Sequence, residues 1–183
     1  MFHSIRLFVV AMAISLAACD ASEEIRIGEK GVGPITIATP HDAEAIAALL
    51  PGWNVATTFV PRHGEDYRFI VAGRGQAIDM EFASAGPEAT TVNGVSVFSP
   101  DIPDENGVAV GAVFSDVFSS SAEPRCRRLS DELSGNISCH ATGLRHVFYE
   151  FSGTWRGSDI SDPLSVAAAD WKIVAIHWTH GAL

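Results

Sequence analysis

An apolar run, Leu7–Leu16, ends two alanines before a cysteine, Cys19, and this arrangement constrains the rest of the chain. One cation, Arg6, precedes the run, which completes the three-part layout of a secretory signal. The run is about half of the roughly 20 residues that a membrane-spanning helix needs. We therefore expect residues 1–18 to be removed as a signal peptide and Cys19 to become a lipidated N-terminus.

A lipid anchor at Cys19 would decide how the domain is held. Two or three acyl chains, each buried methylene contributing about 0.8 kcal/mol, make a stable anchor where one chain does not. The chain would then be a bacterial lipoprotein that faces the periplasm. The alternative is an ordinary signal peptide followed by a coincidental cysteine. Asp20 favours the inner membrane over the outer membrane, but the choice of membrane stays open.

The composition after Cys19 suits one folded domain. Hydrophobic residues make up 47% of the chain and charged residues 19%, so a sizeable core is expected and disorder is not. The formal net charge of -10 argues against nucleic acid and against electrostatic docking on anionic lipid. We predict a signal peptide over 1–18, a lipidated tether over 19–30 and a single periplasm-facing domain over 31–183.

Two cysteines, Cys126 and Cys139, remain once Cys19 is assigned to lipid. In an oxidising compartment an even number of remaining cysteines indicates a disulfide. The twelve residues between them are polar and are expected to form an exposed loop. A metal pair or a redox couple is the alternative, although the spacing is far from Cys-x-x-Cys.

The clearest helix start is Thr39-Pro40-His41-Asp42. Thr39 offers a capping hydroxyl, Pro40 suits the first helical position, and His41 is expected to be exposed in the first turn. Pro51-Gly52 ends the pattern. One apolar face of this helix follows at helical spacing: Ala43, Ile46, Ala47 and Leu50.

Elsewhere the apolar residues mostly alternate with polar ones, which is typical of half-buried antiparallel strands. The final run is apolar on both faces and indicates a central strand covered on both sides. We predict an α+β fold, a mainly antiparallel sheet of about six to eight strands with two short helices. The strands are expected near 35–37, 53–59, 67–71, 78–82, 92–98, 147–151 and 171–178, and the second helix near 113–118.

Catalytic motifs are few. The chain has no Gly-x-Ser-x-Gly elbow, no phosphate-cradling glycine loop and no dinucleotide fingerprint, and we predict no cofactor. The alternative is a transition-metal site, with four histidines near the C-terminal strands as its ligands: His140, His146, His177 and His180.

Trp155 and Arg156 are the candidate recognition residues, because tryptophan and arginine are enriched among the residues that dominate binding energy at interfaces. Packing over a sheet edge is the other interpretation of the pair.

The second half of the chain resembles the RpoE-regulated lipoproteins, which are envelope-stress lipoproteins of a family of unknown function. The resemblance rests on motifs in matching order and spacing: Asp101-Ile102-Pro103, Gly107-Val108-Ala109-Val110-Gly111, Phe114-Ser115-Asp116, the Cys126 and Cys139 pair, Phe151-Ser152-Gly153-Thr154-Trp155-Arg156-Gly157, Trp171-Lys172 and Ile176-His177-Trp178. It implies a periplasm-facing α+β domain with bridged cysteines and carries over no catalytic or ligand-binding residue.

Two hypotheses of function follow. The first is a non-enzymatic binding or assembly module of the cell envelope, linked to envelope stress, with a protein, glycan or lipid partner. The second is an envelope hydrolase or metal-dependent enzyme that uses the C-terminal histidines or carboxylates.

Overall fold

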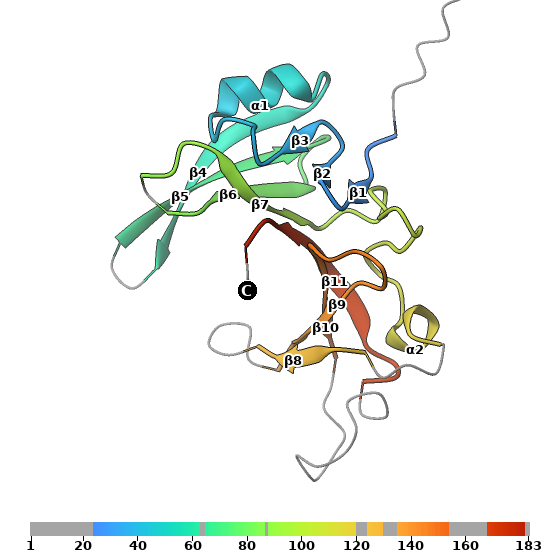
Figure 1. Cartoon of the computed structure of the whole chain (residues 1–183). Coiled ribbons are helices and arrows are strands. Elements are labelled where there is room, and N and C mark those ends of the chain that lie inside the picture. Colours follow the sequence, from blue (N-terminus) through green and yellow to red (C-terminus); the bar gives the residue numbers. More distant parts are fainter. Residues whose placement is uncertain are drawn as a thin grey trace, which may run out of the picture.

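The structure is a computed structural model, and it confirms the predicted α+β class (Figure 1). An eight-stranded sheet, a small three-stranded sheet and two short helices make up the described part of the chain. Neither of these helices is long and apolar enough to cross a membrane. The described residues are 24–62, 65–86, 88–119, 124–129, 135–153 and 168–181.

The large sheet has the strand order β4-β5-β6-β7-β11-β10-β9-β8, and every neighbouring pair is antiparallel. Two groups of consecutive strands, β4–β7 and β8–β10, occupy the upper and lower parts of Figure 1 and meet only through β11. The strands are β4 (Asn54–Arg62), β5 (Glu65–Gly73), β6 (Met80–Ser84), β7 (Val92–Val97), β8 (Cys126–Arg128), β9 (Ile137–His140), β10 (Val147–Ser152) and β11 (Lys172–Thr179).

The small sheet brings the predicted tether into the folded domain. Its strands are β1 (Ile27–Gly28), β2 (Gly31–Val32) and β3 (Ile35–Thr36). The side chain of Ile27 is fully buried, and its N–H donates to the carbonyl of Pro103 at 3.0 Å. An isoleucine inside the predicted tether, residues 19–30, therefore belongs to the core.

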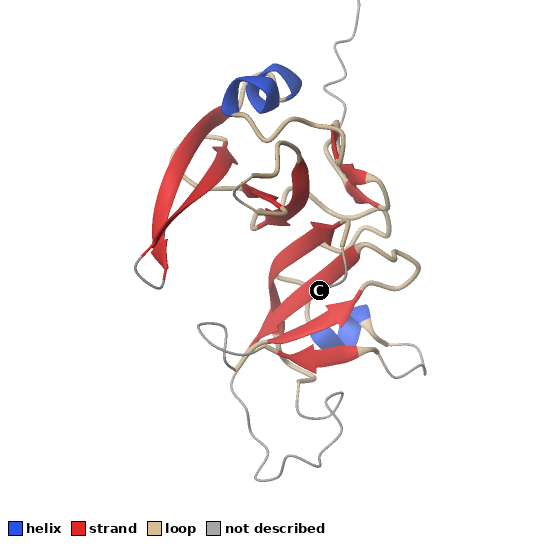
Figure 2. Cartoon of the chain, turned by 60° about the vertical axis from the view of Figure 1, so that its left-hand side comes forward, coloured by secondary structure: helices blue, strands red, loops and turns tan. Residues whose placement is uncertain are grey.

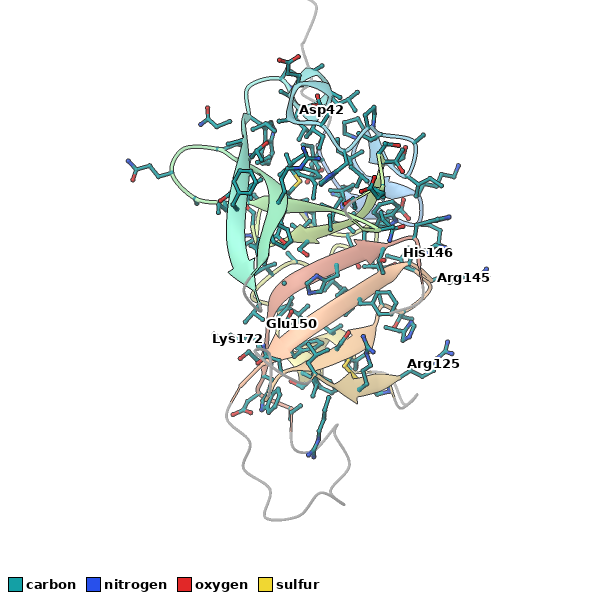
Figure 3. The ribbon with its side chains drawn as sticks, turned by 90° about the vertical axis from the view of Figure 1, so that its left-hand side faces the viewer. Asp42, Arg125, Arg145, His146, Glu150 and Lys172 are labelled. Carbon is teal, nitrogen blue, oxygen red and sulfur yellow. A yellow bond between two sulfur atoms is a disulfide. The ribbon has the colours of Figure 1, made fainter. Side chains whose placement is uncertain are left out.

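Helix α1 (Ala43–Leu49) begins three residues later than its sequence pattern indicates. Asp42 is the N-cap, and its carboxylate accepts two amide N–H groups of the first turn at 3.0 and 3.1 Å. The predicted cap, Thr39, instead accepts the N–H of Thr36 through its hydroxyl at 3.0 Å. The exposed end of the helix, with Asp42, is at the top of Figure 3.

His41 is buried, so the prediction of an exposed side chain is wrong. Its ring Nε2 lies 3.0 Å from the carbonyl of Phe82, to which it donates, and its backbone N–H donates to Thr90 at 2.8 Å. The cause is the later start of α1, which leaves His41 in an extended segment beside the sheet instead of in a solvated first turn.

Helix α2 (Phe114–Val117) lies over the core side of the C-terminal strands (Figure 2). Phe114 is buried, with its ring centroid 5.0 Å from those of both Phe118 and Phe151. The second predicted helix is therefore present, shortened to four residues. Phe114 and, directly after the helix, Phe118 pack in a core that also contains Trp171 and Trp178.

Strand β11 lies inside the sheet as predicted, between β7 and β10. It is not covered on both faces along its whole length, because Val174 is 40% exposed. The pairing of β10 with β11 shifts between Glu150 and Phe151, so that Val174 has no partner opposite it in the register. This bulge turns one apolar side chain outward and reorients the residues that follow.

The two ends of the segment between the cysteines are paired strands, β8 and β9, whereas residues 130–134 of the expected exposed loop lie outside the described residues. Cys126 on β8 stands directly opposite Cys139 on β9, with a Cα–Cα distance of 4.0 Å, and the two are joined in a disulfide. Ile137 and Ser138 are buried beside them. Backbone pairing overrides the polar sequence here, since each strand supplies ladder hydrogen bonds to its neighbour.

Candidate functional site

The second face of the large sheet, turned away from the hydrophobic core, carries a set of polar side chains. Residues directly opposite each other in neighbouring strands point to the same side of a sheet. The register places one row of side chains on this face across β9, β10, β11 and β7: His140, Phe148, His177 and Ser96. Glu150 belongs to the adjacent row on the same face.

Three of these side chains form a hydrogen-bonded row. Ser96 Oγ lies 2.9 Å from His177 Nδ1, and His177 Nε2 lies 2.9 Å from Glu150 Oε2. The second carboxylate oxygen of Glu150 accepts from the amide of Asn136 at 2.6 Å. Because a carboxylate only accepts, it fixes a proton on Nε2 of the imidazole ring.

The carboxylate of Glu150 is held in its charged form although its side chain is buried. The hydrogen bond from His177 holds the pKa of Glu150 below its ordinary value, burial opposes this, and the hydrogen bond from Asn136 assists it. Serine, histidine and carboxylate in contact are also the parts of a serine-activating arrangement. Ser96 meets Nδ1 and not Nε2, and it is half-buried.

Next to this row the same face opens into a groove of about 490 Å³, which we call the basic groove. Its floor contains Phe148 and Ser138, the neighbours of His177 and Glu150 in the register. The basic groove is lined by Arg125, Cys126, Arg127, Ser138, His140, Arg145, His146, Phe148, His180 and Gly181.

Positive charge is concentrated in this groove. Three of the chain's 12 lysines and arginines line it, with no aspartate or glutamate among the lining residues, although the whole chain carries 22 acidic side chains. In the part of the chain that the structure describes, no carboxylate pairs with the guanidinium groups of Arg125, Arg127 or Arg145. These cations are therefore free to meet an anion from outside.

His140 contributes a neutral ring to the basic groove. Burial, and then the charges of Arg125 and Arg127, hold the pKa of His140 below its ordinary value. Its ring centroid lies 4.4 Å from that of Phe148. The groove thus combines a charged rim with an apolar, aromatic floor.

One carboxylate stands at the rim. Glu29 Oε2 accepts the backbone N–H of Arg145 at 2.7 Å, and Glu29 Oε1 lies 3.8 Å from His146 Nε2. Figure 3 shows Arg145 and His146 together at one end of the strands, with Lys172 at the other end. Glu29 therefore links the segment before β2 to the groove and partly offsets its positive charge.

The disulfide holds the most cationic edge of the groove in place. Strand β8 is a short edge strand that begins at Cys126, with Arg127 on it and Arg125 directly before it. Edge strands of three residues bring few hydrogen bonds of their own. The covalent link to Cys139 on β9 fixes the position of both arginines relative to the sheet.

A second hollow, of about 570 Å³, lies between the small sheet and α1. Its charges are mixed, with Arg26 and Lys30 beside Glu24 and Glu105, and Arg26 pairs with Glu24 at 2.9 Å. Leu49 and other apolar side chains form much of its wall. This hollow offers no excess of either charge.

The structure describes some of the predicted site residues and not others. The disulfide between Cys126 and Cys139 is present. Cys19, the lipidation candidate, and the recognition pair Trp155 and Arg156 lie outside the described residues, so these remain predictions.

The four C-terminal histidines divide between two places. His140, His146 and His180 line the basic groove, whereas His177 is engaged with Ser96 and Glu150. Within the described ranges, no group of three or more histidine, cysteine, aspartate or glutamate side chains is arranged to hold a metal ion.

The basic groove itself was not predicted from the sequence. Its one local signal is the Arg125-Cys126-Arg127-Arg128 run, which stands out in an acidic chain. Arg145 and His146 join that run only through the pairing of β8, β9 and β10.

Comparisons with known proteins show the family to which this chain belongs. The chain belongs to the family described as "Protein of unknown function (DUF1131)", whose model matches residues 17–180. It is 28% identical over 191 residues to "Uncharacterized protein YfeY" of Escherichia coli (strain K12), covering 96% of this chain and 98% of that protein. The crystal structure of yfeY from Escherichia coli superposes with a TM-score of 0.68 at 30% identity, covering 85% of this chain and 99% of that one.

Proposed function

We propose that this protein is a lipoprotein of the bacterial cell envelope, anchored through Cys19 and facing the periplasm, that acts as a non-enzymatic binding module. The observation that carries the proposal is the basic groove, an open site with three arginines that pair with no carboxylate among the described residues, on a chain of net charge -10. Charge of the sign opposite to the rest of the molecule, gathered at a hollow with an aromatic floor, favours recognition of an anionic partner.

The membrane anchor is the first part to test. Mass spectrometry of the N-terminal peptide is expected to show a diacylglyceryl-modified Cys19, and membrane fractionation is expected to place the protein with a membrane. Cys19→Ala should release it from membranes. Asp20 favours the inner membrane, and separation of inner and outer membranes on a density gradient decides this. An unmodified Cys19 in envelope-derived protein would remove the anchor from the proposal.

The binding role is tested by photo-crosslinking in living cells. A photoreactive amino acid at His180, on the groove, is expected to capture a specific envelope component, whereas the same group at Lys172, far along the same face, is not. Identical adducts from both positions, or none from His180, would count against a binding module that uses this groove. Expression is expected to rise under outer-membrane stress, which transcript measurements can check.

A second candidate function is a hydrolase, favoured by the contacts of His177 with Ser96 and Glu150. In that role His177 would take the proton of the serine hydroxyl. A fluorophosphonate probe would then label Ser96 in the native protein and fail to label the Ser96→Ala and His177→Ala variants. Absence of labelling at Ser96 would remove this candidate.

A further inference from the structure

The basic groove gathers donors that suit one chemical class of ligand. A carboxylate carries one charge and two oxygens, and one guanidinium fork satisfies it. A phosphate monoester carries about -1.5 to -2 charges and three terminal oxygens, so it can accept from several forks at once. Three arginines around a single hollow of about 490 Å³ therefore match a phosphate better than a carboxylate.

The floor indicates what the phosphate is attached to. Phe148 and the ring of His140 form an aromatic surface beside the charged rim. An organic group bonded to the phosphate can lie on this surface while the phosphate meets the arginines. Inorganic phosphate would use only the rim.

The groove also lies close to the predicted anchor along the chain. Glu29 contacts Arg145 and His146 at the rim, and Cys19 stands only ten residues before it. Ten residues of chain span at most about 35 Å, even if fully extended. A lipid-anchored copy therefore keeps the groove within reach of phosphorylated headgroups in its own membrane.

We propose that the basic groove is a phosphate-binding site for a phosphate monoester, with Arg125, Arg127 and Arg145 as its ligating side chains. The assignment deepens the proposed binding function and rests on it. Glu29 weakens phosphate binding in this assignment, because its carboxylate stands beside Arg145 and His146 at one end of the groove and repels an anion there.

Calorimetric titration of the full-length protein in a non-ionic detergent tests the assignment. Inorganic phosphate and water-soluble dihexanoyl phosphatidic acid are the two probes, with acetate as the reference anion. We expect saturable binding of both phosphates, weaker binding of acetate, and a decrease in affinity as salt is raised. Tighter binding of the phosphatidic acid would identify a lipid headgroup as the source, and equal binding would identify the phosphate group alone.

Single substitutions locate the site. Arg125→Gln, Arg127→Gln and Arg145→Gln should each weaken phosphate binding by about fivefold, the upper end for an exposed ion pair. Lys172→Gln removes an equal charge from the far end of the same face and should leave binding unchanged. Glu29→Gln retains an acceptor for the Arg145 N–H and should strengthen binding by about twofold. Far-UV circular dichroism and thermal unfolding confirm the fold of each variant.

Several outcomes overturn the assignment. They are the absence of saturable binding of either phosphate, acetate binding as tight as that of phosphate, or arginine variants that bind like the wild type. Photo-crosslinks from His180 without phosphate binding would keep the binding module and remove only its ligand class. Phosphate binding by a protein that fractionates away from membranes would instead keep the groove assignment and remove the anchored module.

Discussion

A buried hydrogen bond between Tyr149 and Asp104 makes a contribution to stability that can be measured directly. Asp104 is fully buried, and its Oδ1 accepts backbone N–H groups from Asn106 at 2.9 Å and Val108 at 2.8 Å. Its other carboxylate oxygen accepts the hydroxyl of Tyr149 on β10. Burial, and then this hydrogen bond and the charge of Asp104, raise the pKa of Tyr149 well above its ordinary value. The pair joins the loop before α2 to the sheet.

Tyr149→Phe should destabilise the protein by about 1.5–3 kcal/mol, the usual contribution of a hydrogen bond to a charged group. The phenylalanine ring keeps the contacts that Tyr149 makes with Phe118 and Phe151, at centroid distances of 6.2 Å, so the change isolates the hydroxyl. With a urea dependence of about 2 kcal/mol per molar, the unfolding midpoint should fall by about 1 M.

The assay is equilibrium unfolding in urea, followed by circular dichroism with the disulfide intact. Asp104→Asn and the double variant complete a cycle that measures the coupling between the two side chains. We expect the double variant to lose less stability than the sum of the single variants. A Tyr149→Phe midpoint within about 0.2 M of the wild type, or strictly additive losses, would refute a buried charge-assisted hydrogen bond at this position.

Three further predictions concern the sheet and its turns. Glu150 has a lowered pKa, so its stabilising contribution is present above the ordinary pKa of 4.5 and is lost as pH falls through the lower folded-state pKa. The urea midpoint of Glu150→Gln should therefore decline less steeply with acid than that of the wild type, and equal slopes would contradict this. Reduction of the disulfide should cost about 3 kcal/mol from loop entropy, measured by urea unfolding with and without reductant, and an unchanged midpoint would mean that the bridge does not constrain the unfolded chain. Gly31→Ala should lower stability by about 2–3 kcal/mol, because a Cβ there would stand 1.9 Å from the carbonyl oxygen of Ile35. Gly52→Ala meets open space and should lower stability by about 1–2 kcal/mol through its positive φ alone. Equal losses in thermal unfolding of the two variants would contradict the steric argument.

The start of α1 shows why local signals predict the presence of an element better than its boundary. Thr39 and Asp42 are both favoured N-caps, three residues apart, and their intrinsic preferences differ too little to decide between them. The decision comes from the sheet: Val92 donates to the carbonyl of Thr39 and His41 donates to that of Thr90, at 2.9 and 2.8 Å. These long-range bonds hold residues 39–41 extended and leave Asp42 as the cap.

The basic groove shows the corresponding limit for a site. The alternation of apolar residues predicted strands near β3–β7, β10 and β11 but not β8 and β9, and the two cysteines left after Cys19 predicted the disulfide. The register between β8, β9 and β10 is what brings Arg127 near Arg145, and strand order is not encoded in the periodicity of either segment. Strands β8 and β9 contain few apolar residues, so the sequence shows no clear alternation of apolar and polar residues there.

The position of β11 sets an order of events for folding. The strands on its two sides, β7 and β10, both precede it in the chain, yet they are joined to each other only through it. The N-terminal and C-terminal groups of strands can each form, but they lack a shared neighbour until residues 172–179 pair with both. Deletion of β11 would therefore leave two half-sheets with unpaired edges that invite association between chains.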